Sequence, residues 1–158
     1  MRVKGIVDED FIQYKNPSMF IVTCFCNWKC CLDGGFDKAI CQNSSLSLSP
    51  IIEISNIELI TRYLKNPITS SIVFGGLEPF EQFEELELFV KEFRKFSNDD
   101  IVIYTGFNKE EIINKVNILS KYKNIVIKFG RYIPNQKSKY DEVLGVTLAS
   151  PNQKGERF

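Results

Sequence analysis

All cysteines of this chain of 158 residues lie in one short segment. They are Cys24, Cys26, Cys30, Cys31 and Cys41. A single cysteine is often just a small buried side chain, but random placement would rarely gather all of them so closely. Thiolates bind zinc and iron–sulfur clusters. We therefore expect this segment to hold a metal centre.

The cysteine spacing favours a ligand set of three. Cys26 and Cys30 have three residues between them, and Cys41 returns after a ten-residue excursion. Adjacent side chains tend to diverge, so Cys30 and Cys31 are not expected to face one centre together. Structural zinc commonly takes four ligands in two close pairs, and zinc with Cys24 or Cys31 as a further ligand stays open as an alternative. Three thiolates suit a four-iron cluster that leaves one iron free for a ligand.

The rest of the composition excludes several kinds of catalytic and metal-binding site. The chain has no histidine, which excludes Ser-His-Asp and Cys-His catalysis and histidine-bound metals. Twenty basic residues balance twenty acidic ones, so no strong field attracts nucleic acid or a membrane surface. The N-terminus has no signal-peptide pattern, and no apolar run is long enough to span a membrane. We expect a cytoplasmic protein, where clustered thiols indicate metal or redox chemistry.

The remaining sequence alternates between strand and helix patterns. Helix starts are indicated by the capping-box patterns Ser55-Asn-Ile-Glu58 and Asn108-Lys-Glu-Glu111. The segment from Cys24 to Pro50 has no clear periodicity and is expected to be a functional loop. Strands are predicted at 3–7, 19–23, 71–74, 101–104, 124–129 and 142–148, and helices at 55–65, 81–96 and 108–121. This order predicts an α/β fold built from parallel βαβ units.

Several short segments carry a family resemblance. In chain order they are Asp10-Phe11-Ile12 to Phe20-Ile21, Cys26-Asn-Trp-Lys-Cys30, Ile40-Cys41-Gln42-Asn43, Gly75-Gly76-Leu77-Glu78-Pro79, Tyr104-Thr105-Gly106-Phe107, the segment 128–133, and Ser150-Pro151-Asn152-Gln153. Together they resemble the radical S-adenosylmethionine superfamily, most closely the activating enzymes of anaerobic ribonucleotide reductases. The sequence departs from that family's motifs in the long excursion before Cys41, in the inserted Leu77, and in the absence of an aspartate near position 128.

The resemblance implies a fold and a division of the chain. The fold would be a partial, open parallel β/α barrel of the radical S-adenosylmethionine type. Residues 1–158 would form one domain, with a cluster loop at 24–43 and a mobile tail at about 150–158.

The resemblance also implies an activity. A 4Fe-4S cluster on Cys26, Cys30 and Cys41 would reductively cleave S-adenosylmethionine to a 5′-deoxyadenosyl radical and install a glycyl radical on a partner, such as an anaerobic ribonucleotide reductase. A flavodoxin-like or other low-potential donor would supply the electron. No catalytic residue is expected beyond the cluster ligands. The residues implied to bind the cofactor are Ile40, Asn43, Gly75, Gly76, Glu78, Pro79, Tyr104 and Thr105.

Other functions remain open from the sequence. The chain could be a radical enzyme that acts on a small molecule or a peptide, or a non-enzymatic module that binds a cluster or zinc for a structural or redox-sensing role. Glu78 could equally be an exposed glutamate in an ordinary turn. Arg131 could pair with a carboxylate or a partner, or be a solvated surface residue.

Overall fold

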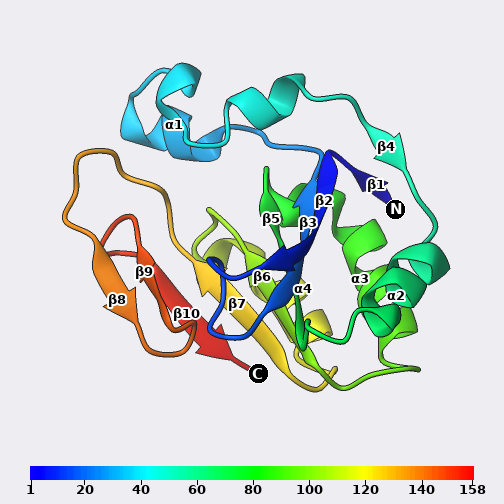
Figure 1. The fold of residues 1–158 in the computed structure, drawn as a ribbon. Coiled ribbons are helices and arrows are strands. Elements are labelled where there is room, and N and C mark those ends of the chain that lie inside the picture. The colour runs from blue at the N-terminus through cyan, green and yellow to red at the C-terminus, as the bar shows by residue number, and fades with distance from the viewer.

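A computed structural model describes residues 1–158, and a six-stranded sheet forms its centre (Figure 1). The strand order is β10-β7-β6-β5-β3-β2. The bounds are β2 (Gly5–Asp10), β3 (Ser18–Thr23), β5 (Ser71–Gly76), β6 (Asp100–Tyr104), β7 (Ile125–Phe129) and β10 (Lys154–Arg157). Strands β3, β5, β6 and β7 are parallel, whereas β2 and β10 run antiparallel to their neighbours at the two edges. The prediction of an α/β fold with parallel strands is confirmed, and the sheet is open because its edge strands do not pair.

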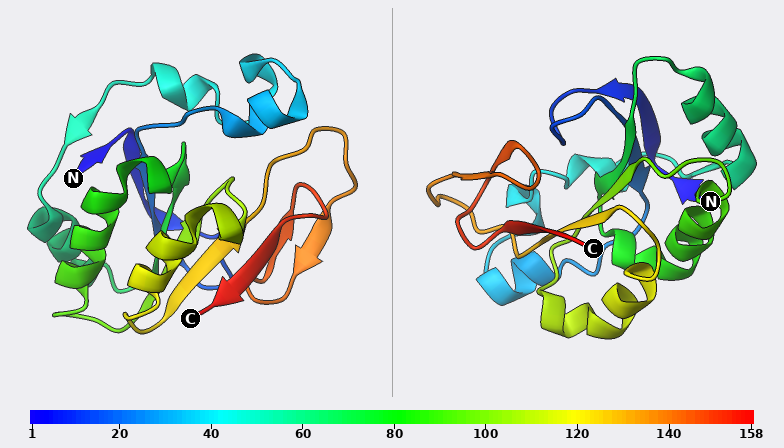
Figure 2. Two further views of the ribbon diagram at one scale, coloured as in Figure 1. Left: turned by 180° about the vertical axis from the view of Figure 1, so that it is seen from behind. Right: turned by 90° about the horizontal axis from the view of Figure 1, so that it is seen from below.

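Helices cover one face of the sheet (Figure 2). They are α2 (Asn56–Lys65), α3 (Phe83–Phe93) and α4 (Ile113–Leu119), with the 3-10 turns η3 (Pro79–Gln82) and η4 (Lys109–Ile112) leading into the last two. Both predicted helix starts are confirmed, because Ser55 accepts from the Glu58 amide and Asn108 forms a complete capping box with Glu111. The apolar stripe of α3, with Leu86, Phe89, Val90 and Phe93, is fully buried against the sheet.

Side chains alternate across the sheet, as the strand geometry requires. Ile72 and Phe74 of β5 face the helices, whereas Val73 between them faces the other side. There it joins Val102 and Val126 in a smaller cluster. This second cluster is completed by Tyr14, Leu144 and Leu148. Residues beyond β7, together with Tyr14 between β2 and β3, therefore cover the face that the helices leave open.

The cysteine segment is more ordered than the sequence predicts. It contains the short helix α1 (Lys29–Gly34) and the 3-10 turns η1 (Lys38–Ile40) and η2 (Ser45–Leu48). After these turns, β4 (Ile52–Glu53) pairs with β1 (Arg2–Val3). The segment crosses over the carboxyl ends of the parallel strands (Figure 1). Short turns of this kind leave little periodicity in a sequence, so the prediction of a plain loop missed them.

The C-terminal residues also differ from expectation. The segment 150–158 was expected to be a mobile tail, but it holds Ser150 and Gln153 in buried positions and adds β10 to the sheet. A separate hairpin precedes it, formed by β8 (Lys139–Asp141) and β9 (Val146–Leu148). The polar composition of β10 was misleading, because an edge strand with exposed side chains needs few apolar residues. None of the helices has the length and apolar character needed to cross a membrane.

Candidate functional site

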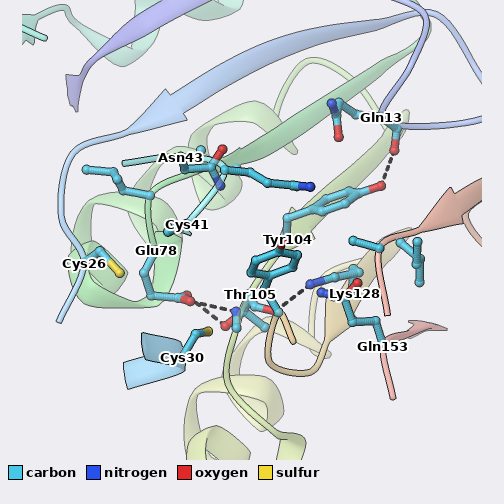
Figure 3. A pocket seen from close by; sticks show the side chains of 18 of the residues that line it. Gln13, Cys26, Cys30, Cys41, Asn43, Glu78, Tyr104, Thr105, Lys128 and Gln153 are labelled. Carbon is cyan, nitrogen blue, oxygen red and sulfur yellow. Dashed lines mark hydrogen bonds between the residues drawn. The ribbon is translucent and has the colours of Figure 1, made fainter. Parts of the chain in front are cut away.

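A cavity of about 550 Å³ lies where the parallel strands end and the cysteine segment crosses them. Its walls include the carboxyl ends of β5, β6 and β7, the cysteine segment, and β9. In open α/β sheets, ligands bind at this edge because the strand-to-helix turns leave a crevice there. The volume is in the range of small-molecule sites. Figure 3 shows the side chains that point into this cavity.

Cys26, Cys30 and Cys41 all line this cavity (Figure 3). Cys26 follows β3, Cys30 lies in the first turn of α1, and Cys41 follows η1 directly. All three are partly exposed, unlike the other two cysteines. No group of three or more Cys, Asp or Glu side chains is arranged to hold one metal ion. A four-iron cluster needs one thiolate on each iron rather than several on one ion, so three thiols facing a common cavity fit such a group.

The backbone between Cys26 and Cys30 adopts an uncommon conformation. Trp28 has a φ of 60°, in the left-handed region that side chains other than glycine rarely occupy. This turn lets the Trp28 amide donate to the sulfur of Cys26 at 3.2 Å and starts α1 at the next residue. Burial raises the pKa of Cys26 to about 12. Metal binding at this thiol must therefore displace a proton.

Cys24 and Cys31 are buried, with exposed fractions of 4% and 3%. Cys24 lies outside the cavity, and its amide donates to the side chain of Gln82 at 2.7 Å. Cys31 is on the inner side of α1 and reaches the cavity wall. Burial raises the pKa of both thiols. Of the two possible replacement ligands, only Cys31 lies near the place where a cluster would sit.

Glu78 is the only acidic residue that lines the cavity. Only 6% of it is exposed, which excludes the exposed-turn alternative. Its carboxylate accepts from the Thr105 hydroxyl and the Gly106 amide, both at 2.8 Å, and from the Phe80 amide at 3.1 Å. Burial raises the pKa of Glu78 to about 7, although these donors oppose the shift. A carboxylate offers about four lone-pair sites, so one remains for a ligand.

The glycine pair before Glu78 brings backbone to the cavity wall. Gly75 and Gly76 both line the cavity. Gly76 has a φ of 88°, and an added Cβ would lie 2.5 Å from Cγ1 of Val22, so only glycine fits there. Pro79 is buried at the start of η3 and does not line the cavity. Its position stiffens the turn that carries Glu78.

Of the other residues implied to bind the cofactor, the structure places three at the cavity and one outside it. Tyr104, Thr105 and Asn43 line the cavity, and the Tyr104 hydroxyl donates to the Gln13 carbonyl at 2.5 Å. Ile40, expected near the adenine, is half exposed and does not line it.

Two basic residues of this region were not assigned to the site from the sequence. Lys128 lines the cavity, with 7% of its surface exposed. Burial lowers the pKa of Lys128 to about 8, against the opposite effect of Glu78. A lysine within the apolar run 125–129 was the signal that could have identified it.

Arg131 is a buried link, not a solvated surface residue. It donates to Asp33 of α1 at 3.0 Å and to Glu111 of η4 at 2.7 Å. It also donates to the Gly106 carbonyl. Arg131 therefore fastens the helix that carries Cys30 to the ends of β6 and β7.

Comparison with known proteins gives one match. No curated protein and no solved structure is significantly similar to the chain. Residues 18–153 match the family described as the 4Fe-4S single cluster domain. That range contains the five cysteines and every strand end that lines the cavity. The chain thus belongs to the 4Fe-4S single cluster domain family.

Proposed function

We propose that this iron–sulfur protein reductively cleaves S-adenosylmethionine and passes the radical to a glycine of a partner protein, such as an anaerobic ribonucleotide reductase. The supporting observation is the cavity beside Cys26, Cys30 and Cys41. A cluster with a purely structural role needs no ligand cavity next to it. The open sheet, whose four central strands are parallel, is compatible with a partial barrel of the radical S-adenosylmethionine type.

The chain's own residues would hold the cluster and orient its ligand. Cys26, Cys30 and Cys41 would each hold one iron of a 4Fe-4S cluster, which would leave one iron for a ligand in the cavity. A cluster held in this way would supply the electron that cleaves the sulfonium C–S bond, with methionine and a 5′-deoxyadenosyl radical as the products. The electron comes from a low-potential donor, for which a flavodoxin-like protein is suited.

Glu78 would orient the amino-acid part of S-adenosylmethionine. Its carboxylate has one acceptor site beyond its three bonds inside the protein, which an ammonium group can fill. The bonds to Thr105 and Gly106 fix its position before the ligand arrives. Such preorganisation lowers the entropic cost of binding.

A second candidate is a cluster module without S-adenosylmethionine chemistry. One observation favours it: the three donors of Glu78 lie within the protein, as expected for a structural carboxylate. In that case the cluster would serve structure or redox sensing.

The two candidates differ in one product. We would reconstitute the protein with iron and sulfide without oxygen, reduce it, add S-adenosylmethionine, and quantify 5′-deoxyadenosine by chromatography. Product from the wild type and from Cys24→Ala, but not from Cys26→Ala/Cys30→Ala/Cys41→Ala, would support the enzyme. A stable cluster without product would favour the module.

A further inference from the structure

Cys31 is a thiol at the cavity wall that the proposed ligand set does not use. It lines the same cavity as Cys26, Cys30 and Cys41, yet only 3% of it is exposed. A buried cysteine is often only a small apolar side chain. Here it belongs to a group of four thiols around one cavity, so its chemistry depends on which of them it faces.

Cys26 and Cys30 are each held by a contact of their own. The Cys26 sulfur accepts from the Trp28 amide at 3.2 Å. The Cys30 sulfur packs so closely against Gly106 that a Cβ added there would lie 2.6 Å from it. These contacts direct the two thiols toward the strand ends, and Figure 3 shows both of them beside Glu78.

Cys31 has a different neighbour. Burial raises the pKa of Cys31, and among the charged groups around it Cys41 raises this pKa most. Burial raises the pKa of Cys30 as well, but the charges that act on it most are those of Arg131 and Glu78. Within the group of four thiols, Cys31 is therefore the one directed to Cys41.

The chain between these two residues leaves room for their sulfurs to meet. Residues 32–40 separate Cys31 from Cys41, and closing a loop of this length costs little chain entropy. The loop turns at Gly35, which has a φ of 64° and no other atom within 4 Å of its Cβ position. Cys41 follows η1 in an extended conformation and is partly exposed. The turn can therefore adjust without disturbing a packed side chain at Gly35.

We infer that Cys31 and Cys41 form a disulfide when the cluster is absent. The partly exposed Cys41 reacts first with a small disulfide such as oxidised glutathione, and one glutathione thiol leaves. Cys31 then attacks the mixed disulfide, which forms the bond between Cys31 and Cys41 and releases the second glutathione thiol. Each cysteine loses one proton and one electron, which oxidised glutathione takes up as it becomes two thiols.

This disulfide regulates loading of the cluster site. It keeps Cys41 from binding iron until a dithiol reductant opens it. It also protects Cys41 from oxidation to sulfinic and sulfonic acids, which thiol reductants do not reverse. In reducing compartments protein disulfides are usually transient and redox-sensing. The inference concerns the cluster site alone, so it holds for either candidate function.

The test maps the disulfide by mass spectrometry. Tryptic cleavage after lysine and arginine places Cys30 and Cys31 in the peptide 30–38 and Cys41 in the peptide 39–62. The full chain would be stripped of iron with a chelator without oxygen, treated with oxidised glutathione, alkylated with iodoacetamide and digested. We expect these two peptides, linked by a disulfide, as the main oxidised product. In the iron-loaded protein the linked pair should be absent, because Cys41 holds iron. Equal amounts in both forms would separate the disulfide from the cluster and overturn the inference.

Two variants locate the bond. Cys31→Ala replaces a buried thiol by a small apolar side chain and should abolish the linked pair, with glutathione left on Cys41. Cys24→Ala changes an equally buried cysteine outside the cavity and should form the pair like the wild type. If Cys31→Ala does not fold, fragmentation of the wild-type pair between Cys30 and Cys31 places the bond. A pair that persists in Cys31→Ala, a bond on Cys30, or glutathione that stays on Cys41 of the wild type would overturn the inference.

Discussion

The sulfur of Cys30 packs against Gly106 so closely that a Cβ added at Gly106 would lie 2.6 Å from it. Gly106 follows the end of β6 and lies next to Glu78, whose carboxylate accepts from its amide. Because residue 106 is a glycine, the Cys30 thiol has room to lie at the cavity wall. The strand that presents Thr105 to Glu78 also sets the position of a cluster ligand.

Gly106→Ala should impair cluster binding without unfolding the protein. The φ of Gly106 is not positive, so the backbone there accepts alanine without strain. The added methyl group would instead clash with the Cys30 sulfur. Displacement of one ligand loosens the site. We expect less than about half of the wild-type iron after reconstitution, with an unchanged far-ultraviolet circular dichroism spectrum.

Gly5→Ala is the matched control for this substitution. A Cβ there would meet only Val22, at an ordinary distance of 3.9 Å. This variant should load iron like the wild type. Normal iron in Gly106→Ala would show that the contact with Cys30 does not govern its position.

Arg131→Gln should loosen the helix that carries Cys30. Arg131 links Asp33 and Glu111 with only 11% of its side chain exposed. Replacing Arg131 removes two ion pairs and the bond to the Gly106 carbonyl, but both carboxylates stay partly solvated and keep Lys29 nearby. We therefore expect about 1–2 kcal/mol lower free energy of unfolding. Urea unfolding measures this change, and loss of bound iron to a chelator should also become faster.

Lys29→Gln provides the comparison for Arg131. Lys29 contacts the same Asp33 and Glu111, but at 3.4 and 3.7 Å and with 39% of its side chain exposed. Exposed pairs of this kind contribute about 0.5 kcal/mol or less. Equal losses in the two variants would refute a special role for Arg131.

Asp100→Asn should weaken the attachment of β10 in a pH-dependent way. The Arg157 guanidinium and the Tyr14 hydroxyl hold the pKa of Asp100 below its usual value. Because this pKa is lower in the folded state, the stabilisation is present above the unfolded pKa and is lost as the pH falls through the folded one. We expect a deficit of about 1–2 kcal/mol at pH 7.

Urea unfolding of both proteins over a range of pH measures this deficit. The deficit should be constant above about pH 5 and begin to shrink below about pH 4, where Asp100 of the unfolded wild-type chain takes up a proton while folded Asp100 is still ionised. A deficit that does not depend on pH would contradict the ion pair with Arg157.

Sequence patterns predicted the long elements well. The stripe of α3, the capping box at Asn108 and the apolar run of β5 are local signals that need no knowledge of the tertiary structure. Strand β10 carries no such signal, because its pairing with β7 depends on backbone hydrogen bonds.

The candidate site was predicted through its cysteines and its glycine turn. Thiols and glycine pairs are informative from residue type alone. Lys128 and Arg131 were not assigned, because their roles come from burial and from partners on distant segments. Ile40 was implied by the family resemblance alone, and its half-exposed side chain does not line the cavity.

The central claim is that Cys26, Cys30 and Cys41 hold a four-iron cluster with one iron open to the cavity. Electron paramagnetic resonance of the reduced, reconstituted protein, with and without S-adenosylmethionine, tests it most directly. We predict a 4Fe-4S signal whose g-values shift when the ligand is added, and no such signal when Cys26, Cys30 and Cys41 are all alanine. A signal that the ligand leaves unchanged, or bound zinc in place of iron, would contradict the account.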